Sequence, residues 1–111
     1  DASDMELEKN INIINRVVDI AHKKNVLVEA ELGQIKGVED NISYNGDSVV
    51  QYKEIDTFLK NSNIDMVAVA FGNAHGIYKG TPKLNYDIVR YVTKRIDPLL
   101  FMEEVACLMR Y

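Results

Sequence analysis

The chain has 111 residues, and its 47% hydrophobic and 27% charged residues are typical of an ordinary soluble globular domain. The 13 Lys and Arg residues against 17 Asp and Glu give a net charge of −4, which disfavours nucleic acid as a partner. No apolar run reaches the roughly 18 residues of a membrane helix, and the N-terminus lacks the pattern of a secretion signal. We therefore expect one cytoplasmic domain, or part of one, without a membrane partner, and the single Cys107 fits a reducing compartment.

The first half of the chain predicts a helix, a strand and a long loop. Ser3 and Glu6 have the spacing of a capping box, and apolar residues then recur every three or four positions, as in an amphipathic helix. Asn25 is expected to end this helix, because Asn tolerates the left-handed conformation. A strand is expected over residues 26–32. Residues 33–50 are rich in Gly, Asn and Asp without periodicity, so we expect a functional or mobile loop there.

The second half predicts two more helices that alternate with strands. Apolar residues at helical spacing indicate one helix near residues 52–59 and another that begins at Asn85, a good N-cap. Residues 66–71 are continuously apolar, the pattern of a strand covered on both faces, and a last strand is expected over residues 96–101. Short buried strands between amphipathic helices predict an α/β fold with a parallel sheet.

Two carboxylates on the first predicted strand are candidates for function. Glu29 and Glu31 are two positions apart, so their side chains point to the same face of the strand. If that face is buried, a cation must lie nearby or one carboxyl must hold a proton, because two like charges are costly to bury. The alternative is that this end of the strand is exposed and both carboxylates are solvated.

The Gly-rich segment after the second predicted strand is a second candidate. His75 follows this strand between Gly72 and Gly76, at the edge where parallel α/β folds bind their ligands. The glycines allow the main chain to approach an anion or a metal closely, and Lys79 adds a cation suited to phosphate. A lone His is nevertheless more often structural than a ligand, so spacing alone leaves both interpretations open.

The other charged positions have ordinary explanations from spacing alone. Glu39 and Asp40 form an acidic pair in the long loop, and such pairs are usually solvated. His22 is interpreted as a surface residue on the polar side of the first helix. Lys94 and Arg95 end the third predicted helix, where cations complement the helix dipole.

Four segments, in the right order, resemble the class II, zinc-dependent ketose-bisphosphate aldolases. Val-Glu-Ala-Glu-Leu-Gly, followed by Gly37, Glu39 and Asp40, is similar to one family signature, and Phe-Gly-Asn-Ala-His-Gly-Ile-Tyr-Lys is similar to another. The matching segments are 1–3, 28–40, 71–79 and 83–86. The resemblance implies that residues 1–100 form a central segment of a (β/α)8 TIM barrel, from the end of strand 4 through strand 7.

The resemblance also implies roles for five residues. His75 would be one of three zinc-binding histidines, and Glu31 a carboxylate that the metal engages in an alternative position. Glu39 would be the acid/base on a mobile loop that removes a proton from the triose phosphate. Lys79 and the main chain of Gly76 would hold a substrate phosphate. The implied reaction is zinc-dependent, reversible aldol cleavage of fructose 1,6-bisphosphate to dihydroxyacetone phosphate and glyceraldehyde 3-phosphate, with tagatose bisphosphate as an open alternative.

The chain departs from the family pattern in ways that predict inactivity when it is alone. The first zinc His of the family and its catalytic Asp lie before Asp1, and the segment that carries the third His is replaced from Phe101 onwards. Codons permitted for residues 101–111 spell His-Gly-Gly-Ser-Gly in another reading frame. We therefore expect residues 101–111 to be a frameshifted tail outside the family.

Three other functions stay open at this point. The chain could be a non-catalytic fragment that self-associates as a homo-oligomer through the open edges of its sheet. It could instead complete an active site together with another barrel fragment. Without the family resemblance, a phosphate-binding α/β module built on Gly72, Gly76 and Lys79 is the remaining interpretation.

Overall fold

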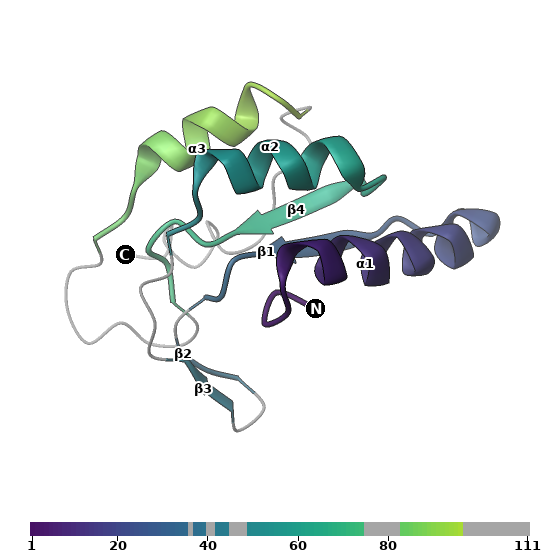
Figure 1. The fold of residues 1–111 in the computed structure, drawn as a ribbon, viewed down its shortest axis with the longest axis horizontal. Helices are drawn as coiled ribbons and strands as arrows, with labels where there is room; N and C mark the ends of the chain where they lie inside the picture. Colours follow the sequence, from purple (N-terminus) through teal and green to yellow (C-terminus); the bar gives the residue numbers. More distant parts are fainter. Residues whose placement is uncertain (36, 40–41, 45–48, 75–82, 97–111) are drawn as a thin grey trace.

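The computed structural model describes residues 1–35, 37–39, 42–44, 49–74 and 83–96, and for residues 37–39 and 42–44 it describes the main chain alone (Figure 1). In chain order the elements are α1 (Leu7–Ala21), the short 3₁₀ helix η1 (His22–Lys24), β1 (Glu29–Leu32), β2 (Gly37–Glu39), β3 (Ile42–Tyr44), α2 (Tyr52–Asn61), β4 (Met66–Val69) and α3 (Tyr86–Thr93). No helix within these ranges is long and apolar enough to cross a membrane.

Strands β1 and β4 form a parallel pair, as the alternation of strands and helices predicts. Their register runs from Glu29 opposite Met66 to Leu32 opposite Val69. The main-chain oxygen of Leu32 accepts a hydrogen bond from the N–H of Ala70 at 2.9 Å. The main-chain N–H and C=O groups of the even-numbered residues of β1 therefore point towards β4. The main-chain groups of Glu29 and Glu31 therefore point to the other edge of β1.

The helices cover one face of this strand pair and supply most of the core. Figure 1 shows α1 beside β1, with α2 and α3 next to β4. Burying aliphatic and aromatic side chains contributes about 1.5–3 kcal/mol each, and this is the main force that holds the layers together. The buried contacts come from all three helices and both strands: Ile11, Ile14, Val18, Ala30, Leu32, Ile55, Phe58, Val67, Val69, Ile88 and Val92.

The start of α1 differs from the capping-box prediction. The helix begins at Leu7, with Glu6 as an N-cap whose side chain makes no capping hydrogen bond. The N–H of Ser3 instead bonds to a carboxylate oxygen of Asp1 at 2.7 Å, and the N–H of Met5 bonds to the carbonyl of Ala2 at 3.0 Å. Because the helix begins four residues after Ser3, with Glu6 in the N-cap position, Ser3 does not cap it, and the prediction of a Ser3–Glu6 box is wrong.

The end of this first helical segment and the start of α3 agree with prediction. Asn25 has φ 54° and ψ 39°, the left-handed conformation expected of a helix-ending Asn. The side-chain oxygen of Asn85 accepts a hydrogen bond from the N–H of Asp87 at 3.2 Å, which makes Asn85 the N-cap of α3. Both residues therefore end or begin a helix by the local chemistry of Asn.

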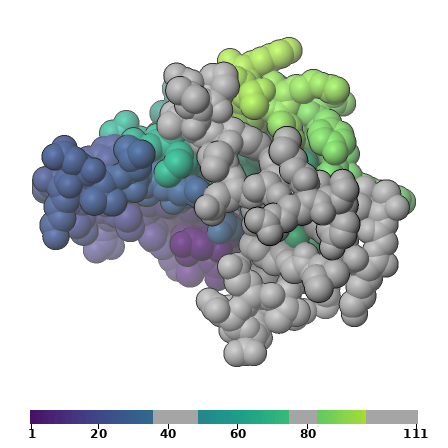
Figure 2. All heavy atoms as spheres, turned by 180° about the vertical axis from the view of Figure 1, so that it is seen from behind, coloured from purple at the N-terminus to yellow at the C-terminus, as the bar shows by residue number. Residues whose placement is uncertain are grey.

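The strands are shorter than predicted at both ends of the pair. Residues 26–28, which were predicted to belong to the first strand, precede β1. The N–H of Val26 bonds to the carbonyl of Ala21 at the end of the helix, and the N–H of Val28 bonds to the side chain of Asp65. Figure 2 shows the blue segment that follows the end of α1 projecting from the rest of the molecule. Strand β4 ends at Val69, and Phe71 forms only an isolated antiparallel bridge with Val49. Of the last predicted strand, Ile96 lies in a bend, and residues 97–101 fall outside the described residues.

The expected loop over residues 33–50 contains regular structure. Strands β2 and β3 pair in antiparallel register, with Gly37 opposite Tyr44 and Glu39 opposite Ile42. The segment also returns to the sheet, because the N–H of Val50 bonds to the carbonyl of Ala70 at 3.2 Å. The prediction of a loop without secondary structure was therefore wrong in this part, since a hairpin this short leaves no long periodic pattern.

Candidate functional site

The two carboxylates of β1 lie on the face of the strand pair opposite the helices. Their neighbours Ala30 and Leu32 are buried in the core, and side chains alternate between the two faces of a strand. Glu29 is exposed and Glu31 is half-buried. The structure therefore places both on one face, as expected, with Glu31 nearer to the carboxyl end of the strand.

The main chain of Glu31 is held by a buried side chain from α1. The Nδ2 group of Asn10 donates a hydrogen bond to the carbonyl oxygen of Glu31 at 3.0 Å, and Asn10 is only 2% exposed. Sequence reasoning missed Asn10, although a signal was present. It occupies a position on the apolar stripe with Leu7, Ile11 and Ile14, where a polar residue needs a specific partner.

Two glycines allow close packing at the carboxyl ends of β1 and β4. Gly33 has φ 81° and Gly72 has φ 99°, conformations that favour glycine. A Cβ atom at Gly33 would collide with the side chain of Val50, and one at Gly72 would collide with the carbonyl oxygen of Lys83. Gly72 therefore brings two of the aldolase-like segments, 71–79 and 83–86, into direct contact.

The start of the segment that carries His75 is anchored to the sheet edge. Asn73 is 1% exposed, and its Oδ1 atom accepts a hydrogen bond from the N–H of Phe71 at 3.0 Å. The carbonyl of Phe71 in turn accepts a hydrogen bond from the N–H of Asn85 at 2.7 Å. These contacts fix the main chain immediately before His75.

A cavity of about 290 Å³ lies at the same edge, between the N-terminal ends of α1 and α2. It is bordered by the turn that follows Asp1 and by the residues that follow β1, so it joins two further aldolase-like segments. Its polar and glycine lining consists of Ser3, Asn10, Gly33, Gln34 and Glu54.

Most of the predicted catalytic groups cannot be placed in this geometry. His75, Gly76 and Lys79 lie outside the described residues, and of Glu39 only the main chain, in β2, is described. Within the described ranges no group of three His, Cys, Asp or Glu could hold a metal ion. A catalytic zinc site needs three protein ligands. The described residues therefore do not fit a zinc site on their own, although Glu31 offers one suitable carboxylate.

A polar cluster at the opposite, amino end of the strands corrects the interpretation of His22. Its Nε2 atom lies 2.8 Å from Oδ2 of Asp65, and the same oxygen accepts a hydrogen bond from the N–H of Val28 at 2.7 Å. The hydrogen bond from His22, followed by that from Val28, holds the pKa of Asp65 below its ordinary value of 3.8. His22 therefore joins the end of the first helical segment to Asp65, at the start of β4, by a side-chain contact.

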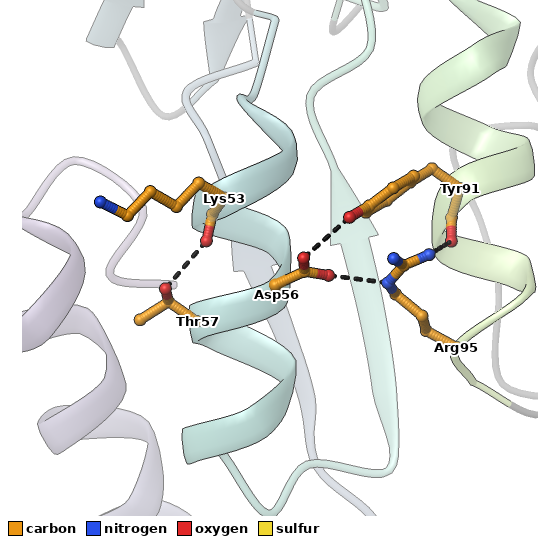
Figure 3. A network of polar contacts seen from close by, with 5 residues as sticks. All are labelled: Lys53, Asp56, Thr57, Tyr91 and Arg95. Atoms are coloured by element: carbon orange, nitrogen blue, oxygen red, sulfur yellow. Dashed lines mark hydrogen bonds and ion pairs between the residues drawn. The ribbon is translucent and has the colours of Figure 1, made fainter.

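A second cluster, on α2 and α3, corrects the interpretation of Arg95 as a simple helix-dipole residue (Figure 3). Asp56 accepts hydrogen bonds from the hydroxyl of Tyr91 at 2.8 Å and from Nε of Arg95 at 2.7 Å. The Arg95 guanidinium also lies 3.4 Å from the centre of the Tyr91 ring. The bond from Tyr91 lowers the pKa of Asp56, and the same bond raises the pKa of Tyr91. This cluster joins two helices and lies away from the site.

Comparison with known proteins decides the family. The sequence model described as "Fructose-bisphosphate aldolase class-II" matches residues 1–105. The chain belongs to the class II fructose-bisphosphate aldolase family. The fructose-bisphosphate aldolases of two Helicobacter pylori strains are each 43% identical over 98 residues, which cover 85% of this chain and 32% of theirs. The chain thus spans about a third of the length of these relatives.

Solved aldolase structures support the same family assignment. The YdjI aldolase of Escherichia coli K12 is 31% identical, with a TM-score of 0.61 over 86% of this chain and 31% of its own. A structure from Coccidioides immitis, presented as a fructose-1,6-biphosphate aldolase, is 26% identical, with a TM-score of 0.69 over 84% and 33%. The β1–β4 pair with its helices therefore resembles a part of these two solved aldolase structures.

Proposed function

We propose that the chain is a central part of a zinc-dependent class II aldolase barrel that cleaves fructose 1,6-bisphosphate reversibly into dihydroxyacetone phosphate and glyceraldehyde 3-phosphate. The observation that carries the proposal is the convergence of the aldolase-like segments on one edge of a parallel strand pair. Gly72 packs against Lys83, and the cavity at this edge joins the turn after Asp1 to Gly33. Ligands of parallel α/β folds bind at this edge. The setting would be the cytoplasm.

The proposed roles follow the family resemblance. Glu39 serves as the acid/base that moves a proton of the triose phosphate, and His75 with Glu31 supplies part of the zinc-ligand set. The main chain of Gly76 and the ammonium of Lys79 bind a phosphate. Zinc, when bound, supplies Lewis-acid polarisation of the substrate ketone. The remaining ligands come from other parts of the barrel, so we expect no cleavage and at most weak zinc binding by this chain alone.

A chimera tests the proposal. The part of this chain that matches the Helicobacter pylori aldolase replaces the corresponding segment of that enzyme, and cleavage of fructose 1,6-bisphosphate is assayed. We expect measurable cleavage, which Glu39→Gln lowers about 10²–10⁴-fold because an acid/base group is lost. The neighbouring change Asp40→Asn is the matched control and should keep most of the activity. A folded chimera without cleavage, or one indifferent to Glu39→Gln, contradicts the proposal.

Zinc binding by the unmodified chain provides a second test. Calorimetry with the native chain and with His75→Ala measures whether the chain forms a site by itself. Tight binding that needs His75, together with cleavage of the bisphosphate, would show that the chain assembles a complete site, contrary to the proposed division of ligands. Weak or absent binding agrees with it.

A further inference from the structure

We draw no further inference here: the strongest candidate, the cavity of about 290 Å³ between the N-terminal ends of α1 and α2, belongs to the candidate site already described, and the buried Oδ1 atom of Asn10 in its lining is too enclosed for a ligand to reach.

Discussion

Asp65 and His22 are 43 positions apart in the chain, yet their side chains meet at 2.8 Å at the amino end of the strand pair. The same carboxylate oxygen accepts the N–H of Val28, so Asp65 joins the end of the first helical segment, the start of β1 and the start of β4. This contact orients the chain as it leaves the helix, before β1 begins. We therefore expect it to contribute to stability in a way that depends on pH.

Acid should weaken the fold through Asp65. Its pKa is lower in the folded chain than its ordinary value of 3.8, so the carboxylate stabilises the fold above about pH 4, and this stabilisation is lost as pH falls through the folded-state pKa. Urea unfolding of the native chain and of Asp65→Asn, followed from neutral pH to about pH 3, checks this. The native chain should lose more stability on acidification than the variant. Parallel pH profiles would contradict the prediction.

The Asp56–Tyr91 hydrogen bond should be visible in the titration of tyrosine. Because Asp56 raises the pKa of Tyr91 above 10.0, Asp56→Asn should move it back towards that value. Ultraviolet absorbance of tyrosinate measures this, with Tyr91→Phe to assign the signal. Asp87→Asn removes another exposed carboxylate, one that pairs with Arg90 on α3, and should leave the titration unchanged. An unaltered curve for Asp56→Asn would show that the bond does not persist in solution.

The two positive-φ glycines should not tolerate alanine equally. Gly33→Ala and Gly72→Ala both impose a left-handed conformation on an L-residue, which costs about 1 kcal/mol or more. The new methyl group meets the side chain of Val50 and the Cβ atom of Ala70 at Gly33, but the main-chain carbonyl of Lys83 at Gly72. The shortest contact at Gly33 is to a Val50 methyl group, which can move by rotation of its side chain, whereas the shortest contact at Gly72 is to main chain, so we expect Gly72→Ala to lower the free energy of unfolding more. Equal losses in urea unfolding would count against this.

The frameshift prediction for residues 101–111 is tested by the gene. If it is correct, the codons of this segment read His-Gly-Gly-Ser-Gly in a shifted frame, and restoring that frame gives a longer chain that continues the aldolase sequence. Codons that do not spell this motif in any frame would refute the prediction. The family match ends within this segment, at residue 105, so the gene sequence is the decisive measurement.

The sequence predicted what depends on local chemistry. The end of the first helical segment at Asn25, the N-cap at Asn85 and the core positions of α2 all follow from short patterns, because caps and amphipathic faces are local interactions. The β1–β4 pairing also followed, from the alternation of strands with helices. These are the parts of the fold in which neighbours along the chain determine the outcome.

The rest depends on partners far apart in the chain. Asn10 could not be assigned to Glu31 from spacing, nor His22 to Asp65, because each pair is brought together only by the packing of α1 against the strands. The start of α1 was mispredicted for a related reason, since the carboxylate of Asp1 takes the N–H of Ser3. Of the candidate site, the place of Gly72 directly after the second strand followed from sequence, whereas the positive φ of Gly33 and the buried amide of Asn10 did not.

The contact between Phe71 and Asn85 has an evolutionary consequence. Their main-chain hydrogen bond, at 2.7 Å, closes a loop whose 13 inner residues, 72–84, include His75 and Lys79. Both ends of this loop are fixed to the sheet edge, and the cost of closing a loop grows only slowly with its length. Insertions between the two anchors can therefore accumulate at little cost to folding, although Gly72 and Asn73 stay constrained by close packing and by a buried hydrogen bond. New substrate preferences can arise there while the strands and helices around them stay the same.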